Sequence, residues 1–209
     1  FDDYVAVASP YASKGYVFER SGDTWSEADQ LTYPGIAGLD RAGAISIDGT
    51  TIALGSQTWD YTETHGEDHL LNSGGASVFN RNAGTGNWDF TQMIVNSDRD
   101  AGDHFGISIS IEGDFIAVGT HSDNHDEEDA AELENAGSAY IFNLSGGTWT
   151  EIDKVDAGDR QAEDEFGISV GISGTTALVG AFQQDYPAGG GTYTEDAGAA
   201  YFFTNGDVG

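Results

Sequence analysis

The 209-residue sequence predicts an all-β fold, a β-propeller built of four-stranded antiparallel blades. Three patterns support this fold class. A β-hairpin pattern recurs along the chain, an aromatic strand follows each hairpin, and a strand led by tryptophan follows the aromatic strand. Four strands in a repeat of roughly 60 residues is typical of a propeller blade. A β-sandwich or β-solenoid would also contain many short strands, but not matching units with the same internal order.

The hairpin pattern is clearest over residues 105–119, where apolar and polar residues alternate, turn at an acidic residue before glycine, and then run apolar. Alternation with a period of two predicts half-buried strands, and the acidic-glycine pair is typical of a hairpin turn. Residues 166–180 repeat the pattern, and residues 42–55 hold an earlier copy. Residues 3–8 match only the second strand of the hairpin, so the first unit lacks its leading strand.

The third and fourth strands of each unit follow from glycine and aromatic positions. Small residues, beginning with glycine, that lead directly into aromatic residues predict the third strand. This pattern occurs at residues 15–18, 75–79, 137–142 and 198–203. The fourth strand is predicted at Trp25, Trp88 and Trp149, each of which follows its aromatic strand after a short turn containing glycine. We expect these equivalent tryptophans to pack between blades; the alternative is that they stack on sugars.

These units divide the chain into repeats at about 1–40, 41–104, 105–165 and 166–209. Two blades are complete, and two are partial because the first lacks its leading strand and the last lacks its tryptophan strand. Propellers need about four to eight blades to close a ring. We therefore expect the chain to be a piece of a longer propeller; the alternative is that a neighbouring molecule supplies the missing strands.

The net charge and the amino-acid composition of the chain disfavour several classes of binding partner. The chain has 36 acidic and 7 basic residues, a net charge of −29 and no cysteine. Nucleic acids and anionic lipid surfaces are disfavoured, because both are bound through Lys and Arg. No apolar run is long enough to insert into a membrane. The absence of cysteine argues against thiol chemistry and a disulfide framework. The charge suits a halophilic or marine setting, or a site that binds cations.

The long loops and inter-blade segments are predicted to gather acidic residues on one face, because alternate loops of an antiparallel meander fall on opposite faces. Calcium prefers carboxylate and carbonyl oxygens in flexible loops, so we expect calcium in the acidic segments between blades. The candidate ligands are Asp98, Asp100, Asp103, Asp156, Asp159 and Asp164. The alternative is that these carboxylates only solvate the surface. No segment matches the EF-hand pattern.

Four loop aromatics are candidates for ligand binding because they lie in long loops on the acidic face. They are Trp59, Tyr61, Tyr186 and Tyr193. The histidine pairs at 65/69 and 121/125 have a spacing that would suit zinc on a helix, but they fall in predicted loops and are interpreted as solvated. Asn143 begins a glycosylation sequon at a predicted hairpin tip. No nucleophile elbow, phosphate loop or Cys-His signature is present, so we expect no enzyme activity.

The Phe105-Gly106 and Phe166-Gly167 pairs, each followed one hairpin later by Ala-Val-Gly or Leu-Val-Gly-Ala, resemble the FG-GAP repeat. Ala8-Ser9-Pro10 stands where that family has Gly-Ala-Pro. The residues of the motif resemble the version of the repeat found in large secreted microbial and algal proteins. Integrin α-subunits share the repeat more distantly. The second unit departs from the pattern, since Arg41-Ala42 replaces Phe-Gly, and the integrin-type Asp-x-Asp-x-Asp-Gly loop is absent.

This resemblance implies a propeller, usually of about seven blades, that is exposed outside the cell, often binds calcium, and serves adhesion or recognition rather than catalysis. Our first hypothesis is therefore a non-enzymatic extracellular or cell-surface module, structural or adhesive, that binds other protein chains, including copies of itself in a filament or appendage. The alternative is a carbohydrate-binding, lectin-like propeller that recognises glycans through its loop aromatics. An enzyme is a third hypothesis that no residue supports.

Overall fold

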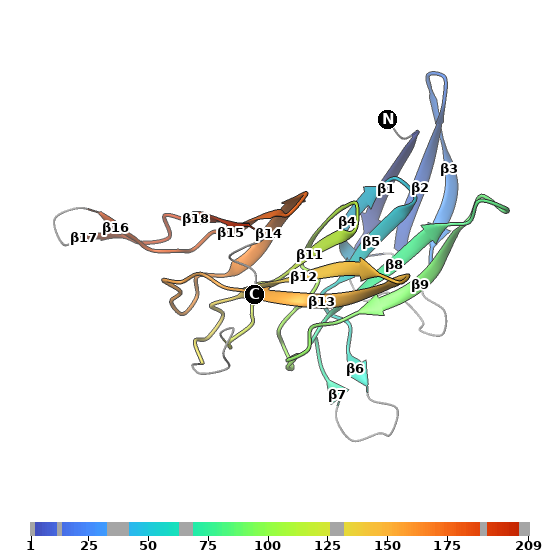
Figure 1. Ribbon diagram of the computed structural model, residues 1–209. Coiled ribbons are helices and arrows are strands. Elements are labelled where there is room, and N and C mark those ends of the chain that lie inside the picture. Colours follow the sequence, from blue (N-terminus) through green and yellow to red (C-terminus); the bar gives the residue numbers. More distant parts are fainter. Residues whose placement is uncertain are drawn as a thin grey trace.

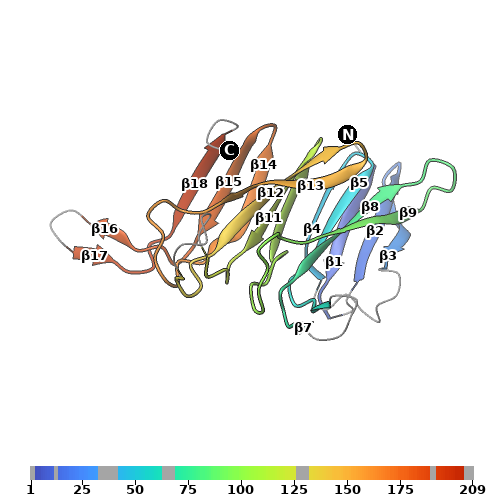
Figure 2. The ribbon, with the colours of Figure 1, turned by 60° about the horizontal axis from the view of Figure 1, so that its bottom comes forward.

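The computed structural model describes residues 3–11, 14–32, 42–62, 69–125, 132–188 and 192–204. Every regular element in these segments is a β-strand, and the strands form four larger antiparallel sheets and two small hairpins. The four sheets stand side by side in chain order (Figures 1 and 2). The predicted all-β fold of propeller blades is confirmed. No helix within these segments has the length and apolar character needed to cross a membrane.

We number the four sheets as blades 1 to 4. Blade 1 consists of β1 (Tyr4–Ser9), β2 (Lys14–Ser21) and β3 (Thr24–Leu31). Blade 2 consists of β4 (Ala42–Asp48), β5 (Thr51–Ser56), β8 (Gly75–Arg81) and β9 (Trp88–Ile94). Blade 3 consists of β10 (Ser108–Glu112), β11 (Phe115–Thr120), β12 (Ser138–Ser145) and β13 (Thr148–Val155). Blade 4 consists of β14 (Phe166–Ser173), β15 (Thr176–Ala181) and β18 (Ala199–Thr204).

The two small hairpins lie inside long loops that the sequence suggested were irregular. One pairs β6 (Tyr61–Thr62) with β7 (His69–Leu70), between β5 and β8. The other pairs β16 (Tyr186–Ala188) with β17 (Thr192–Thr194), between β15 and β18. Both project away from the row of blades in Figure 1. Strands of two or three residues are too short for alternation to be visible in a sequence.

Strand register repeats from blade to blade, including its irregularities. A bulge separates Val17 from Phe18 in β2, and the same bulge recurs at Val78/Phe79 in β8 and at Ile141/Phe142 in β12. A bulge of this kind shifts the pairing with the next strand by one residue. The recurring bulge therefore fixes which residues of different blades are structurally equivalent.

The hydrophobic core lies between blades rather than within one sheet. We call the side of a blade that faces the preceding blade its rear face, and the opposite side its front face. Trp88 on the rear face of blade 2 packs edge-on against Tyr4 of blade 1, with ring centroids 5.8 Å apart. Trp149 is likewise buried between blades 2 and 3. Trp25 remains 46% exposed because blade 1 is the first blade described, so inter-blade packing is confirmed for the other two tryptophans only.

A Phe-Gly pair joins blade 3 to blade 2, and a second joins blade 4 to blade 3. Phe105 is fully buried and lies edge-on to Tyr140 and Phe142. Its backbone forms a parallel bridge to Gly74 of blade 2, and Phe166 forms the same bridge to Gly137 of blade 3. We call these two bridges the Phe-Gly latches. Each fastens the start of a new blade to the third strand of the preceding one.

Candidate functional site

A buried polar network joins blades 2 and 3 where the long loops leave the sheets. The ammonium nitrogen of Lys154 lies 2.6 Å from Asp98 Oδ2 and 2.9 Å from Asp123 Oδ2. The Tyr140 hydroxyl lies 2.6 Å from Asp98 Oδ1 and 2.8 Å from Asp123 Oδ2, and donates its single proton to one of them. Asn96 Nδ2 reaches the same hydroxyl oxygen at 3.4 Å. One cation and two carboxylates are thus held together, with Lys154 and Asp123 buried and the Asp98 side chain 32% exposed.

The charges of this network stabilise one another. Burial opposes the charged form of Lys154, but the carboxylates of Asp123 and Asp98 outweigh it and raise the pKa of the ammonium group. Burial likewise works against ionised Asp98, but hydrogen bonds from Lys154 and Tyr140 lower the pKa of its carboxyl group. Burial and the nearby Asp123 and Asp98 charges raise the pKa of the Tyr140 hydroxyl. At neutral pH the lysine and Asp98 are therefore charged, and the tyrosine is neutral.

Asp103 and two histidines lie beside the network. Burial, helped by the nearby Asp123 charge, raises the pKa of Asp103 to about 7, although the Asp100 backbone N–H donates to its carboxylate at 2.6 Å. The rings of His104 and His121 lie 5.4 Å apart. Burial, reinforced by His104, lowers the pKa of His121 to about 4. The imidazole of His121 is therefore neutral at physiological pH.

The predicted calcium ligands of the first acidic segment each have partners within the chain. Asp98 is ion-paired with Lys154, whereas the Asp100 carboxylate lies 3.8 Å from Nδ1 of His125. The Asn96 amide nitrogen lies 3.5 Å from the Asp103 carboxylate and 3.3 Å from the Asp98 carboxylate. The lysine was not anticipated from the sequence. The available signal was that Lys154 is one of only seven basic residues and alternates inward on the tryptophan strand.

The second acidic segment lies between blades 3 and 4. The Tyr201 hydroxyl contacts Asp159 Oδ1 at 2.8 Å and Gln184 Oε1 at 2.9 Å. Asp164 is buried and accepts a hydrogen bond from the Gln161 backbone at 2.6 Å. Asp156 directly follows β13 and is half-buried. Across the ranges that the structure describes, no group of three or more His, Asp or Glu side chains is arranged to hold a metal ion.

Three aligned positions carry different side chains in blades 2 and 3. In blades 2, 3 and 4, the backbone N–H of a glycine just before the third strand donates to a backbone carbonyl oxygen in the preceding loop. The donors are Gly74, Gly137 and Gly198, and the respective acceptors are Trp59, Asp123 and Gln184. These three acceptor residues are therefore structurally equivalent. Strand register aligns the pair Ser77 and Met93 of blade 2 with Tyr140 and Lys154 of blade 3. At these positions blade 2 therefore lacks the charged residues of blade 3, whereas blade 4 keeps the tyrosine as Tyr201.

Two of the four predicted ligand-binding aromatics lie in a packed cluster. Trp59 and Tyr61 are half-buried, with ring centroids 5.8 Å apart, and the Arg99 guanidinium carbon lies 3.9 Å from the centre of the Tyr61 ring. A cation over an aromatic face is a stabilising contact. Both rings thus already have partners within the chain. The side chains of Tyr186 and Tyr193 lie outside the described structure, although their backbones belong to β16 and β17.

Asn143 is in a strand and not at the predicted hairpin tip. It is half-buried in β12, where its amide nitrogen donates to the Asp114 carbonyl oxygen at 3.1 Å, and the turn itself is at Gly146-Gly147. Of the predicted histidine pairs, His65 and the side chain of His69 lie outside the described residues. His125 lies near Asp123, with Nδ1 3.9 Å from the carboxylate. Its partner His121 is instead stacked near His104.

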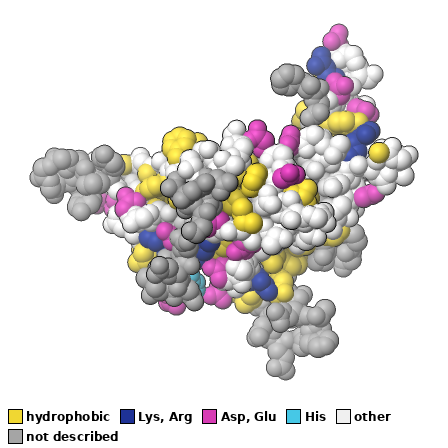
Figure 3. Space-filling view, in the orientation of Figure 1, with side chains coloured by type: hydrophobic (Ala, Val, Ile, Leu, Met, Phe, Trp, Pro, Cys, Tyr) yellow, Lys and Arg dark blue, Asp and Glu magenta, His cyan; other side chains and the backbone are white. Residues whose placement is uncertain are grey.

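The two end faces of the row of blades expose apolar side chains that are buried in the inner blades. Val5 and Val7 on the rear face of blade 1 are 42% and 45% exposed, whereas their counterparts Ile52, Leu54, Ile116 and Val118 are all 0% exposed. On the front face of blade 4, Phe202 is 71% exposed and Leu178 is 40% exposed. Acidic side chains are scattered over the view in Figure 3, with few basic ones among them. The end faces are therefore apolar areas on an acidic molecule.

Comparison with known proteins agrees with this architecture. The model of the FG-GAP repeat matches residues 88–142 and 149–203, which together make up more than half of the chain. No curated protein sequence matches the chain. Among solved structures, the crystal structure of Saccharomyces cerevisiae Sqt1 shares the fold at a TM-score of 0.51 and 9% identity. The alignment covers 98% of this chain and 45% of that one. The matched repeats, the Phe-Gly latches and the row of four-stranded sheets show that this chain belongs to the FG-GAP repeat family.

Proposed function

We propose that this chain is a non-enzymatic extracellular module, adhesive or structural, that assembles with other protein chains through the end faces of its row of blades. FG-GAP propellers generally mediate protein–protein interaction and are generally not enzymes. The observation that carries the proposal is the exposure of Val5, Val7 and Trp25 at one end and of Leu178 and Phe202 at the other. Contiguous exposed apolar side chains are typical of protein interaction sites.

The internal junctions indicate how two copies would meet. At each junction within the chain, the front face of one blade packs on the rear face of the next. The exposed rear face of blade 1 is therefore the kind of surface on which a front face, such as that of blade 4, packs. Contact between these unlike faces is heterologous, and heterologous contacts form rings if the rotation closes and filaments if it does not. Self-assembly by this route is the form of assembly that we propose.

Size-exclusion chromatography with light scattering tests this assembly on the full chain. Val7→Glu and Phe202→Glu should each reduce the average mass, because each places a charge in one end face. An equimolar mixture of the two variants should regain a dimer, since each variant keeps the face that the other has lost. Leu71→Glu is the matched control, because Leu71 is 56% exposed and lies on neither end face. A wild-type chain that remains monomeric at all concentrations would count against the proposal.

We also propose that calcium stabilises the module at the acidic segment between blades 3 and 4. In blade 3, Lys154 neutralises Asp98 and Asp123, so that place already holds a cation. Between blades 3 and 4, Asp164 is buried, and the nearby Asp159 and Asp185 charges help burial to raise its pKa. A bound divalent cation would relieve this repulsion. The net charge of −29 favours cation binding in general.

Thermal unfolding in calcium and in chelator, at matched ionic strength, tests the calcium proposal. A ligand that binds only the folded state raises the melting temperature as its concentration rises. Millimolar calcium should therefore raise the melting temperature of the wild-type chain, and Asp164→Asn should reduce that rise. Magnesium at the same concentration controls for general divalent screening. Superimposable melting curves with and without calcium would remove the metal from the proposal.

A further inference from the structure

Lys154 and Asp98 hold the two halves of an amide bond side by side. The Lys154 ammonium nitrogen lies 2.6 Å from Asp98 Oδ2, and the carbon that carries this oxygen is the atom that an amine attacks to form an amide. Lys154 belongs to β13, whereas Asp98 lies in the segment that joins blade 2 to blade 3. Two groups fixed in contact react with an effective concentration of about 10⁵ M or more when their orientation is right. The fold therefore supplies the proximity that a side-chain amide needs.

Asp123 is in the position of a proton carrier for this pair. Its Oδ2 lies 2.9 Å from the same ammonium nitrogen, and its side chain is 3% exposed. Asp123 Oδ1 accepts a hydrogen bond from the His125 backbone N–H at 2.9 Å, which fixes the orientation of the carboxylate. A carboxylate in contact with the nitrogen can take a proton from it as general base and return the proton to a leaving oxygen as general acid.

Two side-chain donors face the other oxygen of Asp98. The Tyr140 hydroxyl lies 2.6 Å from Asp98 Oδ1, and Asn96 Nδ2 lies 3.3 Å from the same oxygen. Donors aimed at a carboxyl oxygen stabilise the negative charge that develops there when the carbon is attacked. Asp98 is therefore better placed than Asp123 to accept the amine, because it is nearer to the nitrogen and has these two donors.

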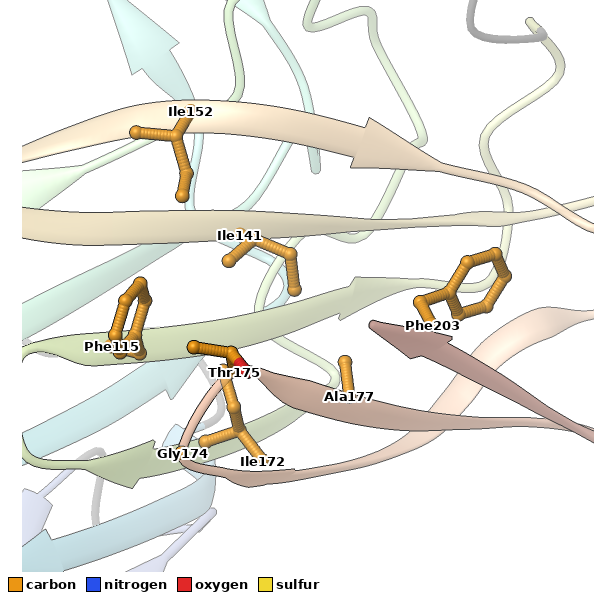
Figure 4. A pocket seen from close by; sticks show the side chains of 8 residues that line it. All are labelled: Phe115, Ile141, Ile152, Ile172, Gly174, Thr175, Ala177 and Phe203. Carbon is orange, nitrogen blue, oxygen red and sulfur yellow. The ribbon is translucent and has the colours of Figure 1, made fainter. Parts of the chain in front are cut away.

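The surroundings of the pair favour a neutral product. Tyr140 and Lys154 pair across β12 and β13 on the rear face of blade 3, where the Phe105 ring lies edge-on to Tyr140. Ile141, the next residue of β12, lies on the front face and lines the apolar cavity between blades 3 and 4 shown in Figure 4. Lys154 is 8% exposed, and burying a charge costs far more than burying an amide. Asp98 is 32% exposed, which leaves a released water a path to solvent.

We propose that Lys154 and Asp98 condense into an intramolecular isopeptide bond, with Asp123 as proton carrier and Tyr140 as donor to the oxygen that becomes charged. The pair rests in its charged form, so a proton first passes from the ammonium nitrogen to Asp98 Oδ2 along their hydrogen bond. The neutral amine then attacks Asp98 Cγ and forms the C–N bond. Asp123 takes a second proton from the nitrogen and gives it to Oδ2, the C–Oδ2 bond breaks, and one water leaves. Asp123 ends ionised, as it began, and no oxidant or other reactant is needed.

The bond would fasten blade 3 covalently to the segment that precedes it. Its two residues are 56 positions apart in the sequence, and a cross-link between distant residues stabilises the fold by restricting the unfolded chain, as a disulfide does. The chain has no cysteine with which to form a disulfide. The amide N–H of the product can still donate to Asp123, so that carboxylate keeps a hydrogen bond. The proposal goes beyond the proposed function and does not depend on it, because the bond can form whether or not the chain assembles.

Mass spectrometry of the full 209-residue chain in denaturant tests the proposal. The mass should be lower than that of the sequence by one water, because denaturant breaks an ion pair but not an amide. Trypsin should cut after Lys14 but not after Lys154, whose nitrogen would no longer be a free ammonium group. Residues 82–99 should therefore stay attached to residues 100–160, with the link between Asp98 and Lys154. A mass equal to that of the sequence, a water lost at other residues, or a link to Asp123 would overturn the proposal.

Three variants sharpen the test. Lys154→Arg keeps a cation beside the carboxylates, but a guanidinium stays protonated and cannot attack, so this variant should have its full sequence mass. Lys14→Arg is the matched control and should remain one water lighter than its sequence. Asp123→Ala removes the proton carrier and should slow the loss of water in freshly produced chain about a hundredfold. Loss of water from Asp123→Ala at the wild-type rate would contradict the role of Asp123. If a variant does not fold, the mass and the tryptic map of the wild-type chain still decide the outcome.

Discussion

Lys154 lies with its ammonium group between two carboxylates that are separated from it along the chain by complete strands. Its side chain is 8% exposed, and that of Asp123 is 3% exposed. Removing one partner of a buried ion pair is costly because the remaining charge stays out of water without compensation. The equivalent position in blade 2 is occupied by Met93, an uncharged side chain. The network is therefore a set of interdependent residues and not a requirement of the blade itself.

Lys154→Met should lower the free energy of unfolding by about 3 kcal/mol, because the buried carboxylate of Asp123 would be left without its cation. Urea denaturation at neutral pH measures this change. Lys14→Met is the control, since the described contact of Lys14 is a surface hydrogen bond to Gln30, and the expected change is within about 0.5 kcal/mol. Adding Asp123→Asn to Lys154→Met should recover part of the loss. Equal effects of the two lysine substitutions would contradict the structural role of the network.

At the scale of strands and turns, the Phe-Gly latches explain why the repeat needs both of its residues. The Phe ring fills the space between two blades, and the glycine that follows adopts a positive φ of 91° at Gly106 and 89° at Gly167. The residue that each Phe bridges to in the preceding blade, Gly74 or Gly137, is also a glycine, but for a different reason. A Cβ atom at Gly137 would overlap the Phe166 carbonyl oxygen. Close approach of two backbones therefore requires glycine there, beyond the requirement for a positive φ.

Gly137→Ala should lower the free energy of unfolding by about 3 kcal/mol or more, because the blades would have to separate to admit a methyl group. Gly146→Ala is a matched control. It also has a positive φ, 60° against 80°, but no atom lies within 4 Å of an added Cβ atom. Its expected cost is about 1 kcal/mol from backbone conformation alone. Guanidinium denaturation of both variants separates the two contributions, and similar losses would show that the close approach does not matter.

At the scale of the whole molecule, the net charge of −29 acts on every blade at once. Few of the acidic side chains have a basic partner, because the chain has only 7 Lys and Arg. Like charges in a compact molecule repel one another, and dissolved salt screens that repulsion. The folded state should therefore depend on ionic strength more than an ordinary domain does.

Raising sodium chloride from about 20 mM to about 500 mM shortens the Debye length several-fold. The melting temperature should rise by about 4 °C over this range, which corresponds to 1 to 2 kcal/mol for a domain of about 200 residues. Calorimetry in calcium-free buffer measures the change. Potassium chloride at the same ionic strength should give the same rise if screening is responsible. An unchanged or lower melting temperature would show that self-repulsion is not a major term.

Strand positions and blade order were predictable from the sequence because both depend on nearby residues. Alternation, turn glycines and the spacing of Trp25, Trp88 and Trp149 report on local backbone geometry and on the period of the repeat. The resemblance to the FG-GAP repeat follows from the same local patterns. By itself the sequence therefore determined the fold class and the order of the strands.

Only the tertiary structure decided which side chains meet. Lys154 and Asp98 are 56 residues apart, and the exposed side chains of the end faces differ from buried ones only in what lies opposite them. Contacts of this kind depend on how one sheet is rotated onto the next, and no short pattern in the chain encodes that rotation.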